Sequence, residues 1–147
     1  MQLFKIIKYP DKRLRKIAKP VKEINNKIKK IIQKMFLTML YNQGIGLAAT
    51  QIDINLKIIV ISNIEQKYKN IVLINPEIIE KRGKYSIEEG CLSIPNKKAF
   101  IKRYKYIKIK ALDYNGKKIF IEGEKLLSVC IQHELDHLTG KLFIDYL

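Results

Sequence analysis

Two helical sequence patterns flank a long central stretch of strand patterns, and this order limits the possible folds more than any other feature of the chain. The first helix is expected to begin at Asn25 or Asn26, and Gly44 and Gly46 are expected to stop it. The second is expected over about 124–138. Because helices and strands do not alternate, parallel βαβ units are disfavoured. The order predicts an α+β fold with a largely antiparallel sheet.

The spacing of apolar residues marks the individual elements. Apolar residues at helical spacing define the first long helix: Ile28, Ile31, Ile32, Met35, Met39 and Leu40. A short helix capped by Asp11 is expected before it, reaching about Ala18 and ended by Pro20. β-branched runs and period-two alternation predict strands over 57–62, 71–74, 104–113 and 119–121. We expect Asn75-Pro76 to close the second strand, Asn115-Gly116 to form a hairpin turn, and Gly140 to cap the last helix.

The composition fits a globular protein of one domain over residues 1–147. Apolar residues make up 47% of the chain, and no apolar run approaches the roughly 18 residues that a membrane helix needs. The first residues lack the apolar segment of a secretory signal, so a cytoplasmic protein is expected. The net charge of +15 admits two interpretations: a nucleic-acid contact, or a compositional bias that favours lysine. The lysines are scattered along all segments, which favours the second interpretation.

The second helix carries the pattern His133-Glu134-Leu135-Asp136-His137. Residues four apart share one face of a helix, so both imidazoles can reach the same metal ion. Glu134 lies one step round the helix, where it can hold a water beside the metal without being a ligand. We therefore predict a metal-dependent hydrolase with Glu134 as general base, and antiparallel strands around a C-terminal metal-binding helix with the N-terminal helix packed outside.

A catalytic site of this type needs a third protein ligand. Phe143 stands where some zinc proteases have a third histidine, and Asp145 in a short tail is the only acidic residue after the motif. Cys130 lies on the same helix, but the rise from it to His137 is about 10.5 Å, too far for one ion to bridge easily. Cys91 has a loop-like context between glycine and proline and is the best candidate. The plain alternative is that Cys91 is a small buried hydrophobic residue.

Three sequence segments together resemble the peptide deformylase family. The chain reads GIGLAATQ at 44–51, EGCLS at 89–93 and QHELDHLTG at 132–140. These match the family motifs GxGLAAxQ, EGCLS and QHExDHLxG in full, in order and in spacing. The first segment alone is a weak signal, since a tight helix-to-strand turn would explain its small residues almost as well. Similar text such as LINPE and KLFIDYL extends the likeness over nearly the whole chain.

The resemblance implies roles that spacing alone does not give. It implies metal ligation by Cys91, His133 and His137, acid/base catalysis by Glu134, and polarisation of the formyl oxygen by Gln51 and the Leu92 N–H. It also implies that the backbone around Ile45 and Gly46 binds the peptide as an added strand. The candidate substrate-binding residues are Gly44, Ile45, Gly46, Glu89, Leu126, Val129 and Cys130, the last three lining a methionine pocket.

The family activity implied is removal of the formyl group from N-terminal formylmethionine of nascent polypeptides, with Fe²⁺ as the usual metal and Zn²⁺ or another divalent metal as a substitute. The expected partners are these peptides and, transiently, the ribosome; a monomer without membrane contact is expected. Many bacterial members continue into a further helix beyond the point where this sequence stops at Leu147. Docking by such a helix is in question here. One hypothesis is that the net charge of +15 provides a nonspecific contact with ribosomal RNA in its place.

Smaller hypotheses and two rival functions accompany this interpretation. Glu89 and Arg103 either pair to brace the Cys91 segment or remain solvated surface charges. Asp136 either accepts an imidazole N–H or is a solvated helix carboxylate. The rivals are a metallopeptidase with the same His-Glu pattern and a basic RNA-binding or ribosomal protein with a structural metal. A purely structural metal site would not need Glu134, which argues against the second rival.

Overall fold

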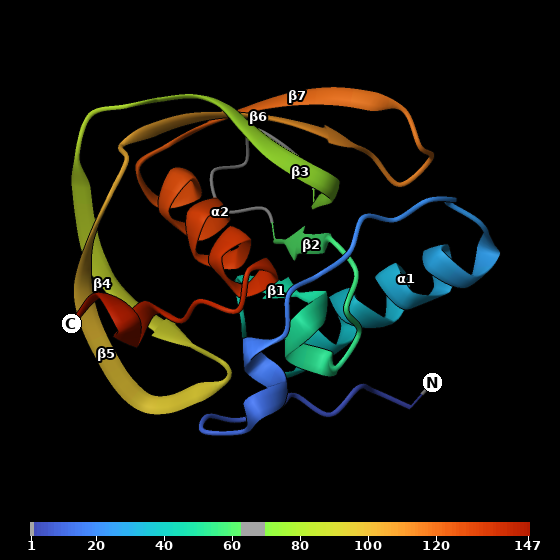
Figure 1. The fold of residues 1–147 in the computed structure, drawn as a ribbon, viewed down its shortest axis with the longest axis horizontal. Helices are drawn as coiled ribbons and strands as arrows, with labels where there is room; N and C mark the ends of the chain where they lie inside the picture. The colour runs from blue at the N-terminus through green and yellow to red at the C-terminus, as the bar shows by residue number, and fades with distance from the viewer. Residues whose placement is uncertain (1, 63–69) are drawn as a thin grey trace.

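The computed structural model describes residues 2–62 and 70–147. Its elements run in the order helix, strands, helix that the sequence predicts, and short 3₁₀ helices occur near both ends and after the first strand (Figure 1). The elements are η1 Lys12–Arg15, α1 Asn26–Tyr41, β1 Gly46–Ala48, η2 Ala49–Ile52, β2 Ile58–Ile61, β3 Ile71–Arg82, β4 Tyr85–Cys91, β5 Ile94–Arg103, β6 Tyr106–Leu112, β7 Lys118–Glu124, α2 Lys125–Leu138 and η3 Phe143–Tyr146.

The strands of the described residues form a five-stranded sheet and a separate two-stranded sheet. The larger sheet has the order β1-β2-β3-β6-β7, and β4 pairs with β5 alone. All of these named strands pair in antiparallel fashion. The predicted α+β class with largely antiparallel strands is therefore confirmed.

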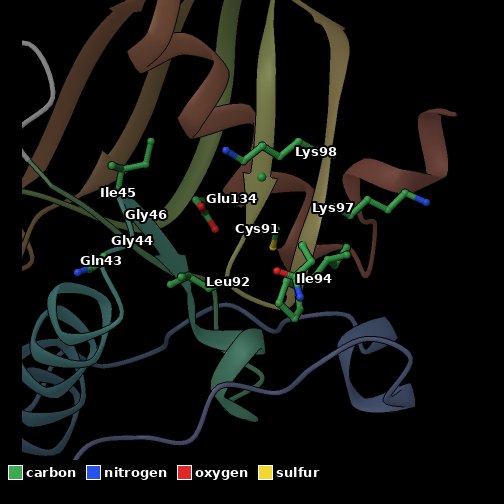
Figure 2. A pocket seen from close by; sticks show the side chains of 13 residues that line it. Gln43, Gly44, Ile45, Gly46, Cys91, Leu92, Ile94, Lys97, Lys98 and Glu134 are labelled. Carbon is green, nitrogen blue, oxygen red and sulfur yellow. The ribbon is translucent and has the colours of Figure 1, made fainter.

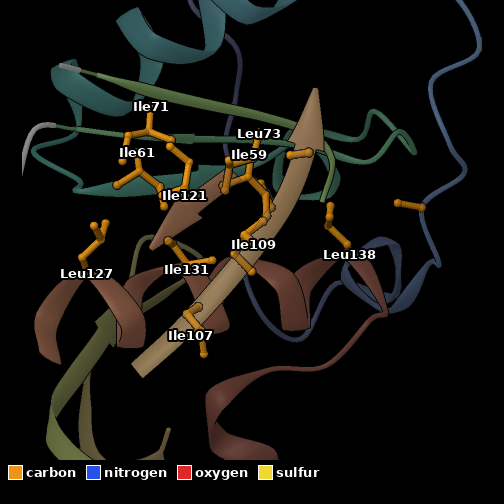
Figure 3. Packing of buried hydrophobic residues seen from close by; sticks show 13 residues of the cluster. Ile59, Ile61, Ile71, Leu73, Ile107, Ile109, Ile121, Leu127, Ile131 and Leu138 are labelled. Carbon is orange, nitrogen blue, oxygen red and sulfur yellow. The ribbon is translucent and has the colours of Figure 1, made fainter. Parts of the chain in front are cut away.

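Helices cover both faces of β2, and this explains why its sequence is continuously apolar. Ile59 and Ile61 face a core that includes Leu127, Ile131 and Leu138 of α2 (Figure 3). The alternate residues of β2 face a second core against α1. A strand between two helices buries side chains on both sides, so it reads as an unbroken β-branched run.

The α2 helix lies near the centre of the molecule, with the β4–β5 hairpin on one side and α1 on the other (Figure 1). Its C-terminus is set by Gly140, which has a φ of 76° as predicted for a cap. The Gly140 N–H donates to the His137 carbonyl, and the Lys141 N–H donates to the Asp136 carbonyl. These two bonds form a Schellman motif, which fixes the last turn of the helix where His137 stands.

A third core joins the β4–β5 hairpin to both ends of the chain. Its buried members are Ile7, Leu14, Ile94, Ile101, Leu142 and Phe143. The hairpin thus packs against the N-terminal segment and η3 rather than extending the larger sheet. It is this packing that brings the end of β4 to α2.

Four local predictions were wrong in detail. The helix after Asp11 is only the 3₁₀ turn η1, which ends at Arg15 rather than near Ala18, although the Asp11 side chain does accept the Arg13 N–H at 2.9 Å. The α1 helix ends at Tyr41, because Gln43 rather than a glycine takes the left-handed conformation with φ 58°.

The other two differences concern strands. β3 does not stop at Asn75-Pro76 but continues to Arg82, with an irregular register between Ile74 and Glu77. A proline fits at such an irregularity because no ladder N–H is required there. Cys91 ends a strand, β4, rather than lying in a loop, and neither β4 nor β5 was predicted. Among the described residues, no helix is long and apolar enough to cross a membrane.

Candidate metal centre and substrate cleft

Three potential metal ligands from two distant segments converge. Cys91 ends β4, while His133 and His137 lie one turn apart on α2, both buried. One donor atom from each lies within 4.8 Å of the others. The two imidazole rings stand edge to face, with centroids 5.1 Å apart. The predicted combination of a cysteine from outside the helix with two helical histidines is present.

The separation of the donor atoms fits a single small cation. The Cys91 Sγ lies 3.4 Å from His137 Nε2. Sulfur and nitrogen ligands of one tetrahedral ion, with bonds near 2.3 and 2.05 Å, would stand about 3.6 Å apart. His137 Nδ1 is buried without a hydrogen-bond partner among the described residues. Cysteine and histidine together suit a transition metal such as Fe²⁺ or Zn²⁺ rather than Mg²⁺ or Ca²⁺.

Glu89 orients the first histidine. Its Oε1 lies 3.0 Å from His133 Nδ1, so the imidazole donates there and keeps Nε2 for a metal. Burial lowers the pKa of His133, but its hydrogen bonds with Cys91 and Glu89 outweigh burial and raise the pKa to about 10. Burial lowers the pKa of His137 well below its usual value. The two imidazoles therefore differ, the pKa of His133 being raised and that of His137 lowered from the ordinary value.

A buried ion network supports this arrangement. The guanidinium of Arg103 donates two hydrogen bonds of 2.9 Å to the two carboxylate oxygens of Glu89, and a third, of 2.7 Å, to Asp136. The Tyr146 hydroxyl donates to the same Asp136 oxygen at 2.8 Å. The hypothesised pair of Glu89 and Arg103 is thus present and buried. Asp136 accepts from Arg103 and Tyr146 rather than from an imidazole, so neither alternative considered for it was right.

Glu134 stands beside the metal ligands and is aimed at a cleft. Its carboxyl group is buried, and Oε1 has no hydrogen-bond partner among the described residues. Burial raises the pKa of Glu134 to about 7, against the lowering effect of His133 and Arg103. Gly46 of β1 lies so close to this carboxyl group that a Cβ added to it would be 2.6 Å from Glu134 Oε2. The small residue that made the first motif conspicuous therefore leaves room for this carboxylate.

Gln51 lies next to Cys91. Its Oε1 accepts the Ala48 N–H at 2.9 Å, which turns the side-chain NH₂ group toward the centre. That group donates to Ser93 Oγ at 3.1 Å and lies 3.7 Å from Cys91 Sγ. Ser93, which was not predicted to act at the site, is fully buried and helps to hold this orientation. Its place in the EGCLS motif was the only signal that could have suggested it.

The cleft lies between the start of β1 and the turn from β4 to β5 (Figure 2). It has a volume of about 370 Å³. Glu134 and Cys91 form its floor, and the other lining residues are Gln43, Gly44, Ile45, Gly46, Gly90, Leu92, Ile94, Pro95, Asn96, Lys97 and Lys98.

The predicted substrate-binding residues divide into two groups. Gly44, Ile45 and Gly46 line the cleft, and an added Cβ on Gly44 would lie 2.5 Å from the Leu92 side chain. The other four, Glu89, Leu126, Val129 and Cys130, do not line this cleft as it stands. Val129 and Cys130 are buried on α2, and Glu89 is engaged by Arg103 and His133.

Comparisons with known proteins agree with the motifs. A family model described as polypeptide deformylase matches residues 3–147. Peptide deformylases of Buchnera aphidicola from Acyrthosiphon pisum (strain APS) and from Schizaphis graminum are 61% and 59% identical over all of this chain, covering 85% and 88% of those proteins.

Solved structures show the same fold. The peptide deformylase from Legionella pneumophila has a TM-score of 0.95 and 46% identity over 99% of this chain and 86% of its own. The Ehrlichia chaffeensis peptide deformylase in complex with actinonin has a TM-score of 0.93 and 38% identity over 100% of this chain and 90% of its own. The predicted resemblance is confirmed.

Proposed function

The chain belongs to the polypeptide deformylase family, and we propose that Cys91, His133 and His137 hold its catalytic metal while Glu134 is the general base. It is a metallohydrolase that removes the N-formyl group from the N-terminal formylmethionine of nascent polypeptides. The observation that carries the residue assignment is the convergence of the three donor atoms within 4.8 Å at the floor of a cleft that Glu134 shares.

We propose Fe²⁺ as the metal, with Zn²⁺ or another divalent transition metal as a substitute. One thiolate and two imidazoles suit either ion. When bound, the metal supplies a Lewis acid that makes water a nucleophile at neutral pH. Loading with each metal in turn, without air, and measuring turnover per bound ion tests the preference.

The protein residues then divide the proton transfers and the charge stabilisation. Glu134 takes a proton from the attacking water and returns it to the leaving amine, a role that suits a carboxylate whose pKa burial raises to about 7. The Gln51 side-chain NH₂ and the Leu92 N–H donate to the formyl oxygen as negative charge develops there. Each such donor contributes about 3 kcal/mol of transition-state stabilisation. Ser93 holds Gln51 in the orientation that this requires.

The free edge of β1 is the proposed platform for the peptide. Among the described strands, β1 pairs only with β2, so its other edge can accept a peptide as an added strand. Gly44 and Gly46 line the cleft at this edge, and Ile45 is half exposed there. We retain Leu126, Val129 and Cys130 as proposed contacts of the methionine side chain, which requires local opening beside α2, and Glu89 as a proposed substrate-binding residue.

We further propose that residues 1–147 form a single catalytic domain that acts as a monomer in the cytoplasm. The family match over residues 3–147 and the sharing of α2 by the core and the site support this domain. A transient ribosome contact is consistent with the net charge of +15. Cosedimentation with ribosomes at low salt, lost at high salt, is the expected result; absence at low salt would contradict the contact.

Formate release from formyl-Met-Ala-Ser tests the function directly. The protein is purified without air and loaded with Fe²⁺, and Glu134→Ala is assayed beside it. We expect release by the unchanged chain and a loss of several orders of magnitude in the variant, with its metal content retained. If the folded, iron-loaded chain releases no formate, the proposed function fails; if Glu134→Ala remains active, the assigned base is wrong.

A further inference from the structure

We propose that Lys98 makes this cleft selective for formyl peptides that carry an acidic side chain within the first residues after methionine. The inference rests on the proposed function, because it assumes that the cleft binds a peptide along β1. It concerns the discrimination between substrates rather than the chemical step.

Lys98 is placed over the cleft by the pairing of β4 with β5. The register sets Glu89 opposite Ala99, so Lys98 lies beside Gly90, one residue before Cys91. An added Cβ on Gly90 would lie 3.8 Å from the Lys98 Cγ. Figure 2 shows the side chain extending across the cleft above Glu134, toward Ile45, whereas the side chain of Lys97 points away. The ammonium therefore lies above the path that a peptide on the β1 edge would follow.

No described residue neutralises this charge. The Lys98 side chain is exposed and forms no ion pair or hydrogen bond with any residue in the described ranges. Among the described residues that line the cleft, Glu134 is the only acidic one, and its proposed role is at the metal centre. A carboxylate brought in by the substrate would be the natural partner of the ammonium.

Because Lys98 and Glu134 line the same cleft, the side chains that follow methionine are the candidates for this contact. Successive residues of an extended peptide advance by about 3.3 Å, so two residues span about 7 Å from the reacting carbon. An exposed pair of opposite charges contributes about two- to five-fold in binding, and an exposed pair of like charges opposes binding by a similar factor. The expected ratio of kcat/KM between Glu-containing and Lys-containing peptides is therefore about ten-fold.

The test compares formyl-Met-X-Ser and formyl-Met-Ala-X peptides in which X is Glu, Gln or Lys. With the iron-loaded chain we expect the order Glu, then Gln, then Lys in one series at least, and a smaller spread in 0.5 M salt because screening weakens exposed pairs. Lys98→Gln should abolish the spread, and Lys98→Glu should reverse it. Formyl-Met-Ala-Ser provides the neutral reference for every variant.

Lys102→Gln is the matched control. Lys102 is exposed on the same strand and does not line the cleft. Its substitution by glutamine removes the same charge as Lys98→Gln. Lys102 lies four residues farther along β5, about 13 Å away and beyond the screening length at physiological salt. We expect it to keep the order of substrates. Equal rates for Glu, Gln and Lys peptides, or an order that survives Lys98→Glu, would refute the inference while leaving deformylation intact. No formate from any peptide would instead refute the proposed function.

Discussion

Substituting Gly46 by alanine should disable the cleft while leaving the fold intact. The new Cβ would lie 2.6 Å from Glu134 Oε2 and 3.1 Å from its Cδ and Cγ. An ordinary contact begins at 3.4 Å, so the carboxylate must retreat by about 0.8 Å. A misplacement near 1 Å can reduce a rate by about 100-fold, so we expect kcat/KM to fall by roughly 10- to 100-fold, or about 1.4 to 2.7 kcal/mol.

The assay is formate release from formyl-Met-Ala-Ser, with metal content and thermal stability measured on the same samples. Alanine in a strand is favoured over glycine by about 0.5–1 kcal/mol, and this gain offsets part of the steric strain at Glu134. The free energy of unfolding should therefore not fall by more than that strain. Gly90→Ala is the comparison, since its added Cβ would have only ordinary contacts, at 3.8 Å or more. The fall in kcat/KM of Gly90→Ala should be several-fold smaller than that of Gly46→Ala. Full activity of Gly46→Ala would refute the view that Glu134 acts from its position against this glycine.

Three further perturbations follow from the structure. Arg103→Met removes the cation that pairs with Glu89 and Asp136 and leaves the Glu89 carboxylate buried. This should lower the free energy of unfolding by about 3–5 kcal/mol in urea titration. A loss below about 1 kcal/mol would contradict the role of the pair. Removing the metal with a chelator should lower the melting temperature in calorimetry, since a ligand at a thousand times its Kd stabilises the folded chain by about 4 kcal/mol. An unchanged melting temperature would exclude a tightly held ion. The Arg15 guanidinium lowers the pKa of Asp145, so the contribution of this pair is present above the unfolded pKa near 4 and is lost as the pH falls below it. Asp145→Asn should therefore flatten stability between pH 5 and 3 by at most about 1 kcal/mol, and an unchanged pH profile would show that the pair contributes nothing.

The parts of the fold that sequence predicted well are those with strong local periodicity. Residues 58–61 and 106–112 carry β-branched or alternating patterns, and both form strands of the larger sheet. The β4–β5 hairpin was missed because about half of its side chains are polar and only a few, such as Ile101, enter a core. Its strands exist through pairing with each other and packing on distant segments. Neither this pairing nor this packing produces a clear periodic pattern of apolar residues in the sequence.

Side chains that act on distant backbone also escaped prediction. Asn75 was interpreted as a strand terminator because Asn-Pro usually marks a turn. In the fold its side chain exchanges two hydrogen bonds with the main chain of Val21, and β3 continues beyond it. Gln43 likewise ends α1 in a conformation more typical of glycine, so the expected stop at Gly44 was misplaced. The first error comes from a partner that is distant in sequence, whereas the end of α1 is set locally, with the Gln43 N–H donating to the Leu40 carbonyl.

The same distinction separates what could be predicted of the site from what could not. His133 and His137 share a face because of helical spacing, which is a local property. The approach of Cys91 depends instead on the β4–β5 hairpin, which does not join the larger sheet. The hairpin is held to α2 through Arg103 and its carboxylate partners, one on each element. A metal bound by ligands from both elements would add a further link across the same junction. Loss of the metal should therefore loosen the hairpin before the central sheet, and amide exchange should rise first in β4 and β5 if this physical account is right.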